Sequence, residues 1–248
     1  DPDDYSNGAA YYYDNKMMIW ASPLDFELRG SHRWLQNVIT HEFAHIVSLQ
    51  KAMKAGTSIP GAYFQFMNYE EEKRPDVLYG YPNTLVSYPL PGTVVPPWLA
   101  EGTAQYMYDD ADWDNWDSHR DMILRDRVIN DNLLSFTEMN TFGKKGIGNE
   151  STYNSGFALA TYIANEYGSD ALSKVMEELS SPLQFSINKA ILNVTGTSGR
   201  EIYQDFKTAI EAKYNTLVDP IRVMPVQGEK LQIEGTTNIH PKWHPTEN

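Results

Sequence analysis

The chain of 248 residues contains no cysteine, which excludes disulfides and zinc sites built from thiolates. It also lacks a run of about 18 apolar residues, so no transmembrane helix is predicted. The first four residues, Asp-Pro-Asp-Asp, are not the basic start of a secretory signal, and a trimmed N-terminus is expected if the protein is exported. The absence of thiols is consistent with an exported protein.

Basic residues are scarce as well. The chain has 20 lysines and arginines against 33 aspartates and glutamates, a formal net charge of −13. This balance argues against a nucleic-acid partner, because phosphate groups require clustered cationic side chains. An acidic surface also serves solubility alone, so the charge identifies no partner. At this length the chain can bury a sizeable core in one or two domains.

The most informative feature present is an HExxH motif at residues 41–45, His-Glu-Phe-Ala-His. Apolar residues recur at three- and four-residue steps through residues 31–54 without a proline, which predicts a helix. His41 and His45 then project from one face and can bind the same metal ion, with Glu42 beside it. HExxH arises by chance about once in a hundred chains of this composition, so the alternative is a helix with two ordinary histidines.

A second segment, residues 96–106, offers a third ligand. Its prolines and the spacing of its apolar residues predict a short helix that begins near Pro97. A catalytic zinc ion usually has three protein ligands and an open fourth position, and Glu101 would complete a set of two histidines and one glutamate. Glu101 lies 56 residues after His45. Alternatively, it is a solvated carboxylate favoured by the helix macrodipole.

A third segment places Tyr153 in the first turn of a predicted helix that ends near Gly168. A phenol at this position can donate a hydrogen bond to the oxyanion that forms when a carbonyl group is attacked. The alternative is that Tyr153 only anchors the helix, with its ring in the core, as most of the 16 tyrosines must.

HEFAH followed by WLAEGTAQY resembles the gluzincin metallopeptidases, in which HExxH and a downstream glutamate hold zinc. The segment YNSGFALATYI is similar to a third block of the M1-type aminopeptidase branch. By this resemblance, His41, His45 and Glu101 bind one Zn²⁺ ion. Glu42 is the general base, and Tyr153 stabilises the oxyanion. The implied reaction is hydrolysis of a peptide bond by a metal-activated water.

The chain departs from the aminopeptidases in three places. Their glycine-rich segment with its amine-binding glutamate is missing, and residues 8–11 do not replace it, which argues against aminopeptidase activity. The spacer between His45 and Glu101 is longer than in that branch. Gln105 stands where many gluzincins have an acidic residue that orients a ligand imidazole. Its amide oxygen can accept the imidazole N–H, with less electrostatic support for the metal.

Residues 1–215 are more closely similar to bacterial secreted proteins whose peptidase-MA-like domain continues into a Tol-type β-propeller. The resemblance implies a metallopeptidase domain over residues 1–215, then a linker and the start of a propeller over residues 216–248. It also implies a location in the bacterial periplasm, at the cell surface or outside the cell. The implied partners are a peptide or protein substrate and, through the propeller, other envelope proteins.

Two further segments carry expectations about substrate access. Residues 16–21 are the candidate for the strand that, in gluzincins, pairs with the substrate backbone. Residues 55–97, rich in proline, glycine and tyrosine, are expected to form irregular covering loops. An amphipathic helix is predicted over residues 198–214.

Two secondary sites have ordinary explanations beside functional ones. Residues 110–114 start like a Ca²⁺-binding loop with Asp121 at its twelfth position, but Asn115 replaces the glycine of the sharp turn. A solvated acidic helix start is therefore preferred over a calcium site. His119 is an alternative oxyanion donor or, equally, a residue of a capped surface helix.

The sequence therefore predicts an α+β fold, mostly α, of gluzincin type, with short N-terminal strands and a C-terminal β segment. The predicted activity is zinc-dependent peptide-bond hydrolysis. The alternative from another class is a non-catalytic, metal-stabilised scaffold or peptide-binding module of a cell-envelope assembly. The intact Glu42 favours the enzyme, whereas Gln105 favours the scaffold. Hydrolysis of a non-peptide amide would use the same residues.

Overall fold

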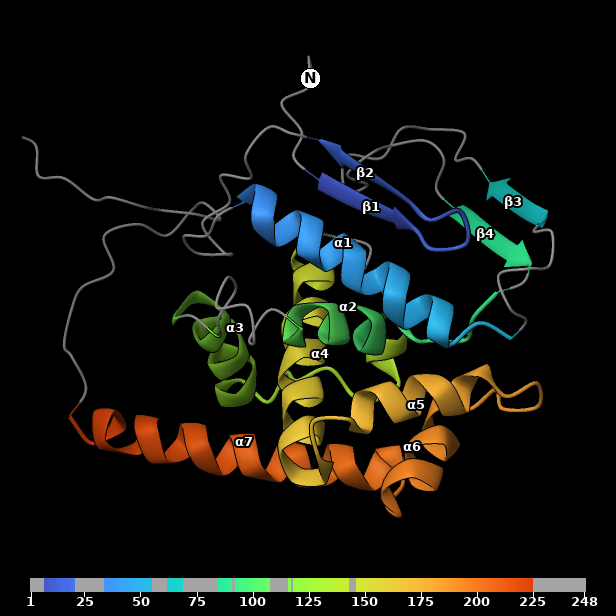
Figure 1. Ribbon diagram of the computed structural model, residues 1–248. Helices are drawn as coiled ribbons and strands as arrows, with labels where there is room; N and C mark the ends of the chain where they lie inside the picture. The colour runs from blue at the N-terminus through green and yellow to red at the C-terminus, as the bar shows by residue number, and fades with distance from the viewer. Residues whose placement is uncertain are drawn as a thin grey trace, which may run out of the picture.

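The computed structural model describes residues 7–20, 34–54, 62–68, 84–90, 92–107, 116, 118–142 and 146–224. Within these ranges the protein is mostly helical, with seven α-helices and two separate two-stranded antiparallel sheets (Figure 1). The prediction of an α+β fold with a majority of helix is confirmed. In the same ranges no helix combines the length and apolar character needed to cross a membrane.

The first two strands form a hairpin that lies on the first long helix. β1 (Asn7–Tyr11) pairs with β2 (Lys16–Trp20), and the turn between them contains Asn15 with a φ of 49°. Asparagine adopts this left-handed conformation more readily than most residues, because its short side chain can hydrogen-bond locally. The hairpin packs on α1 (Trp34–Lys51), at the top of the molecule (Figure 1).

A second hairpin lies in a segment that was expected to be irregular. β3 (Ala62–Asn68) pairs with β4 (Thr84–Leu90). The prediction of covering loops throughout residues 55–97 is therefore wrong for these two strands. The aromatic and β-branched residues of these strands favour an extended backbone. The glycines and prolines around them favour loops, and for this reason the sequence pattern does not predict strands.

The remaining helices form the body of the molecule. They are α2 (Pro97–Tyr106), α3 (Ser118–Ile129), the short 3₁₀ helix η3 (Glu138–Asn140), α4 (Gly146–Tyr167), α5 (Ala171–Ser180), α6 (Ile187–Thr195) and α7 (Gly199–Arg222). Gly168 and Gly196, with φ of 104° and 80°, follow the last residues of α4 and α6. Ser198 and Glu201 form a capping box at the start of α7. The end of α4 just before Gly168 and the start of α7 near residue 198 match the sequence predictions.

Helix α7 continues beyond the predicted domain boundary. The sequence places the start of a linker at residue 216, but the helix runs to Arg222. Pro220 lies in the last turn, where it removes the hydrogen bond to the carbonyl of Thr216 but interrupts only the end of the helix. From residue 225 on, the predicted start of a propeller lies outside the described residues.

Helix α2 lies across α4, beneath α1, at the centre of the body (Figure 1). Its residues Trp98 and Leu99 are 0% and 1% exposed and belong to one apolar core shared with α4 to α7. Glycines allow the two backbones to meet. A Cβ atom added to Gly156 would lie 2.5 Å from the carbonyl oxygen of Trp98, and one added to Gly102 would overlap the backbone of Gly156. The α2–α4 crossing therefore depends on glycine at both positions.

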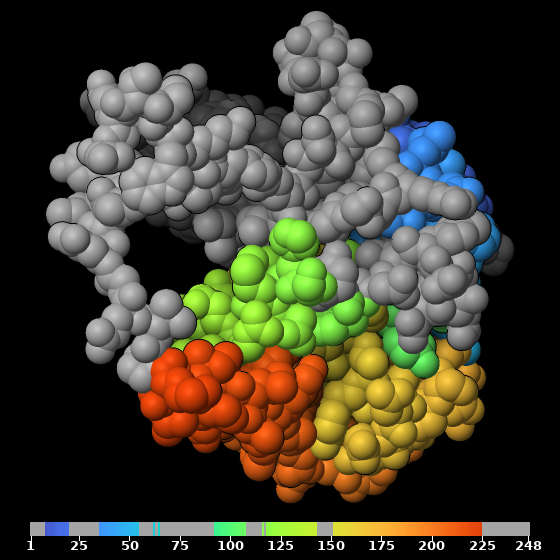
Figure 2. All heavy atoms as spheres, turned by 90° about the vertical axis from the view of Figure 1, so that its left-hand side faces the viewer, coloured from blue at the N-terminus to red at the C-terminus, as the bar shows by residue number. Residues whose placement is uncertain are grey.

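Helix α3 packs on α7, and Figure 2 shows the two helices next to each other on the face that it presents. Asp121 of α3 joins them, because its carboxylate accepts hydrogen bonds from Tyr214 at 2.8 Å and from Trp116 at 3.2 Å. Arg125 pairs with the same carboxylate at 2.8 Å and Lys213 at 3.4 Å. Asp121 therefore has a structural role between two helices.

Candidate metal centre

Helix α1 presents the two histidines of the motif on its buried side. His41 and His45 are one helical turn apart, with ring centroids separated by 4.5 Å and ring planes at 82°. The two residues are 9% and 7% exposed. Phe43, between them in sequence, points away and is 56% exposed. The helical spacing alone thus brings both imidazoles to one place.

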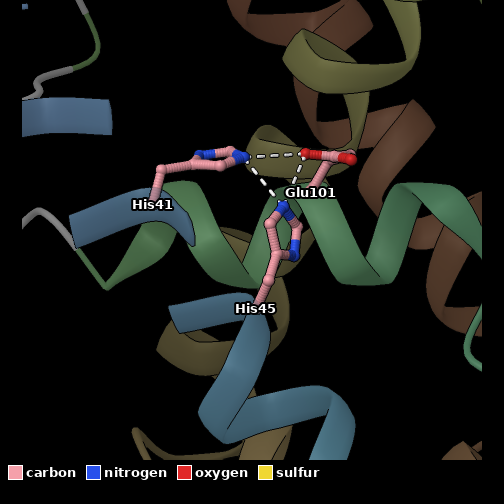
Figure 3. A group of neighbouring side chains, drawn as sticks. All are labelled: His41, His45 and Glu101. Atoms are coloured by element: carbon pink, nitrogen blue, oxygen red, sulfur yellow. Dashed lines mark hydrogen bonds and ion pairs between the residues drawn. The ribbon is translucent and has the colours of Figure 1, made fainter. Parts of the chain in front are cut away.

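Glu101 of α2 completes a buried group of three. Its Oε2 atom lies 2.9 Å from Nε2 of His41 and 3.1 Å from Nε2 of His45. The two Nε2 atoms are 2.9 Å apart. Figure 3 shows both imidazoles and the carboxylate pointing at one another from α1 and α2. The structure therefore brings together the three predicted ligands, although 56 residues separate His45 from Glu101.

The geometry of this triangle fits a cation. Hydrogen bonds cannot satisfy all three edges: if both imidazoles donate to Glu101, their two N–H groups oppose each other. A cation that accepts a lone pair from each of the three atoms removes this conflict. Tetrahedral zinc with bonds of about 2.05 Å spaces its ligand atoms roughly 3.3 Å apart, so the edges need to expand only slightly.

The three ligand side chains shift one another's pKa values. Burial acts to raise the pKa of Glu101, but the charge of His45 and the hydrogen bonds from both imidazoles lower it overall. Burial acts to lower the pKa of His45, and the Glu101 carboxylate raises it overall. A metal ion binds the deprotonated ligands, so protons compete with it and metal affinity decreases as the pH falls.

Glu42 lies beside the group and beneath β1. It is 7% exposed, and its carboxylate accepts a hydrogen bond from the backbone N–H of Ala10. A Cβ atom on Gly8 would lie 2.6 Å from Oε1 of Glu42, so glycine is needed for β1 to approach this closely. Burial raises the pKa of Glu42 to about 7, against the opposing charge of His45. A nearby dication would lower that pKa again, leaving a carboxylate that can accept a proton and return it.

The strand in contact with Glu42 is β1, whereas the sequence favoured residues 16–21 as the substrate-binding strand. Residues 16–20 form β2, which pairs with the opposite edge of β1. Because the N–H of Ala10 bonds to Glu42, the edge of β1 that is not paired with β2 faces the candidate centre. The glycine at position 8 is the sequence signal for this close approach of β1 to α1.

Tyr153 lies next to the histidines, but the prediction that it occupies the first turn of its helix is wrong, because α4 already begins at Gly146. Its ring is half-buried and stacks on the ring of His41, with centroids 6.1 Å apart and planes at 28°. The close α2–α4 crossing explains this position, because Gly102 follows Glu101 directly and Gly156 lies one turn after Tyr153. The structure therefore brings the predicted oxyanion donor to the edge of the group.

Gln105 does not support a ligand imidazole as expected. It is buried one turn after Glu101, but its side-chain oxygen accepts a hydrogen bond from Arg120 of α3. His45 Nδ1 is buried and has no hydrogen-bond partner among the described residues. Arg120 is 4% exposed and lies over the ring of Phe157 at 5.6 Å. Nothing in the polar sequence around Arg120 distinguishes it from a surface arginine.

The two secondary predictions concern His119, as an alternative oxyanion donor, and a calcium loop that starts at residue 110. His119, the second residue of α3, is half-buried and is not one of the clustered ligands. The acidic run at residues 110–115 lies outside the described residues. Asp121, its proposed twelfth position, is already engaged by protein donors on α7 and α3 and by Trp116.

No protein-family model matches the chain, and neither a curated protein nor a solved structure matches it. The functional argument therefore depends on the geometry of the group and its neighbours.

Proposed function

We propose that the protein is a zinc-dependent hydrolase of peptide bonds. The observation that carries the proposal is the buried convergence of His41, His45 and Glu101, with ligand atoms 2.9–3.1 Å apart. Two imidazoles and one carboxylate are a donor set that zinc prefers, and three protein ligands leave a position for water. A chance HExxH sequence gives no reason for a distant glutamate to meet both histidines in the interior.

The side chains around the group have complementary roles in this reaction. A zinc ion held there would supply a water of lowered pKa and polarise the substrate carbonyl. Glu42 takes the proton from that water and delivers it to the leaving amine. Tyr153 donates a hydrogen bond to the oxygen on which negative charge develops. The buried surroundings strengthen both interactions, because few water molecules compete there.

The position of β1 beside Glu42 supports an extended peptide as the substrate. A peptide that lies alongside the hairpin near Glu42 would be aligned through its backbone, with its alternate side chains directed to either face. Backbone pairing of this kind accepts many sequences, so it favours a peptide over a small amide. The hairpin β1–β2 is in turn held on α1, so the strand and the ligands share one support.

The decisive experiment separates metal binding from turnover. Zinc-loaded wild-type protein should cleave members of a peptide library, and a chelator should abolish the cleavage. Glu42→Gln should retain one zinc ion per chain, measured by elemental analysis, and lose about 10²–10⁴-fold in turnover because the proton acceptor is gone. Glu166→Gln, at an exposed glutamate near the end of α4, is the matched control and should behave as wild type. Near-normal turnover of Glu42→Gln would refute the base assignment.

A second candidate is a metal-stabilised scaffold that binds peptides without cleaving them. It is favoured by the unsupported Nδ1 atom of His45 and by the engagement of Gln105 with Arg120. Both features weaken the outer support that ligand imidazoles usually have. Under this alternative the wild-type protein binds zinc and gains thermal stability but cleaves no library member.

The resemblance extends the proposal beyond the site. It supports a gluzincin-type peptidase that is exported to the bacterial periplasm, the cell surface or the exterior. It also supports envelope partners that bind through a propeller after this region.

A further inference from the structure

Three aromatic rings form a ladder that leads from the candidate metal centre to the surface. The ring of His41 stacks on Tyr153, and Tyr153 packs against Phe142 with centroids 6.0 Å apart and planes at 34°. Exposure increases along the ladder. His41 is 9% exposed, Tyr153 is half-buried, and Phe142 is 45% exposed. The row of rings therefore starts at His41, a predicted ligand, and ends at Phe142, which is exposed to solvent.

The segment before Phe142 is held firmly, so its ring has a defined position. Met139 of η3 is 0% exposed and belongs to the main core. The backbone N–H of Ser135 donates to the Glu138 carboxylate at 2.8 Å, and the N–H of Glu138 donates to the Ser135 hydroxyl at 3.2 Å. These bonds fix Glu138, the first residue of η3, which ends at Asn140. Phe142 follows directly on this anchored turn.

We propose that Phe142 forms one wall of an apolar subsite that binds a bulky aliphatic or aromatic side chain flanking the scissile bond. The inference rests on the proposed peptidase function and assigns its substrate class. Two ring-to-ring steps of 6.1 and 6.0 Å place Phe142 no more than about 12 Å from the His41 ring. In an extended peptide, residues are about 3.3 Å apart, so a side chain one or two residues from the scissile bond reaches this wall.

The chemistry of the wall selects the kind of side chain. The exposed ring of Phe142 offers stacking and apolar contact and carries no charge. The acidic groups nearby, Glu42 and Glu101, are engaged with Ala10 and with the two histidines. A substrate side chain that covers Phe142 would also bury apolar surface now in water, which favours binding.

A peptide library cleaved by wild type, Phe142→Ala and Phe142→Leu tests the subsite. Wild type should prefer bulky apolar residues at one position next to the cleaved bond, by about tenfold over alanine. The readout is the ratio of cleavage of bulky to small residues within each variant: Phe142→Ala should lose this preference, whereas Phe142→Leu should retain most of it. Phe185→Ala, at a phenylalanine 68% exposed between α5 and α6, is the matched control and should keep the wild-type profile. An unchanged profile in Phe142→Ala would overturn the proposal.

A binding measurement separates failure of the subsite from failure of the peptidase function. Two hydroxamates, one with a benzyl and one with a methyl side chain, are titrated calorimetrically into the zinc-loaded proteins. The benzyl compound should bind wild type about tenfold more tightly, and Phe142→Ala should remove the difference. If this result is obtained while no peptide is cleaved, the subsite stands and the hydrolase proposal fails. If peptides are cleaved but neither compound depends on Phe142, the subsite proposal fails alone. If zinc and both hydroxamates fail to bind, both proposals fail.

Discussion

The helical body and the candidate metal centre use the protein interior in opposite ways. In the body, α4 to α7 bury apolar side chains such as Leu159, Ile163 and Ile202, each at most 1% exposed. Burying such groups stabilises the fold directly. In the centre, by contrast, the nearly buried side chains are ionisable: His41, Glu42, His45 and Glu101. Burying them opposes folding unless each charge is paired.

This difference assigns separate tasks to the two regions. The body supplies the stability and the rigid α2–α4 crossing, so the fold should form without metal. The centre holds an unresolved conflict among three ligand atoms, which a cation removes. Metal binding should therefore raise the stability of an already folded protein by RT ln(1 + [M]/Kd), unlike in small zinc domains that unfold without metal.

The largest effect should come from removing a ligand charge. Glu101→Gln keeps the shape of the side chain but loses the carboxylate, so zinc affinity should fall at least about a hundredfold. The affinity is measured by competition with a chromophoric chelator. The metal-free variant should still fold, because the body is intact, but its melting temperature should fall because His45 loses the carboxylate that pairs with it. Glu166→Gln serves as the control, and equal zinc affinity in both variants would contradict the ligand assignment.

The next effect should arise where the two regions meet. In Gly156→Ala the new methyl group would lie 2.5 Å from the Trp98 carbonyl oxygen, and a backbone atom cannot move aside. We expect a loss of about 2–3 kcal/mol in unfolding free energy, together with weaker zinc binding as α2 shifts. Both are measured on the same samples, by denaturant titration and by chelator competition.

Gly199→Ala is the control for this crossing. Its Cβ would lie 2.9 Å from the side-chain ends of Ile191 and Phe136, which can adjust, so the loss of stability should be smaller. Zinc affinity should not change. If Gly199→Ala weakened zinc binding as much as Gly156→Ala, the crossing would have no special role in holding the centre.

Local rules predicted much of the helical framework. The start of α2 at Pro97 and the ends of α4 and α6 at Gly168 and Gly196 follow from the residue at each end. The pairing of His41 with His45 is local too, because one helical turn separates them. Glu101 became a candidate only because a third ligand was required and the surrounding sequence resembles that of gluzincins.

The contacts that give the centre its surroundings were not predictable in this way. The bond from Arg120 to Gln105 and the packing of Phe142 on Tyr153 join separate elements, and the short-range pattern does not encode them. The hairpin β3–β4 was missed because glycine and proline around the strands outweighed their own extended preference. Tertiary packing decides such features, and no single window of sequence contains it.

The smallest and sharpest comparison concerns two acids with opposite pKa shifts. Burial raises the pKa of Glu42 to about 7, so in the metal-free protein its contribution is favourable at low pH and is lost as the pH rises toward 7. For Asp121, burial acts to raise the pKa, but hydrogen bonds from Tyr214 and Trp116 and the charge of Lys213 lower it overall. Its contribution is present at neutral pH and is lost as the pH falls through that lowered pKa.

The two amide variants should therefore change stability in opposite directions. Measured by denaturant titration of metal-free protein, Glu42→Gln should raise the unfolding free energy at pH 8 by about 1–2 kcal/mol, with the gain vanishing near pH 4. Asp121→Asn should lower it at pH 7 by about 1 kcal/mol, with the loss disappearing as the pH falls through the lowered pKa of Asp121. Zinc should abolish the gain in Glu42→Gln, because a cation stabilises the wild-type carboxylate. Equal signs for the two variants would show that the centre and the body do not differ in how they hold charge.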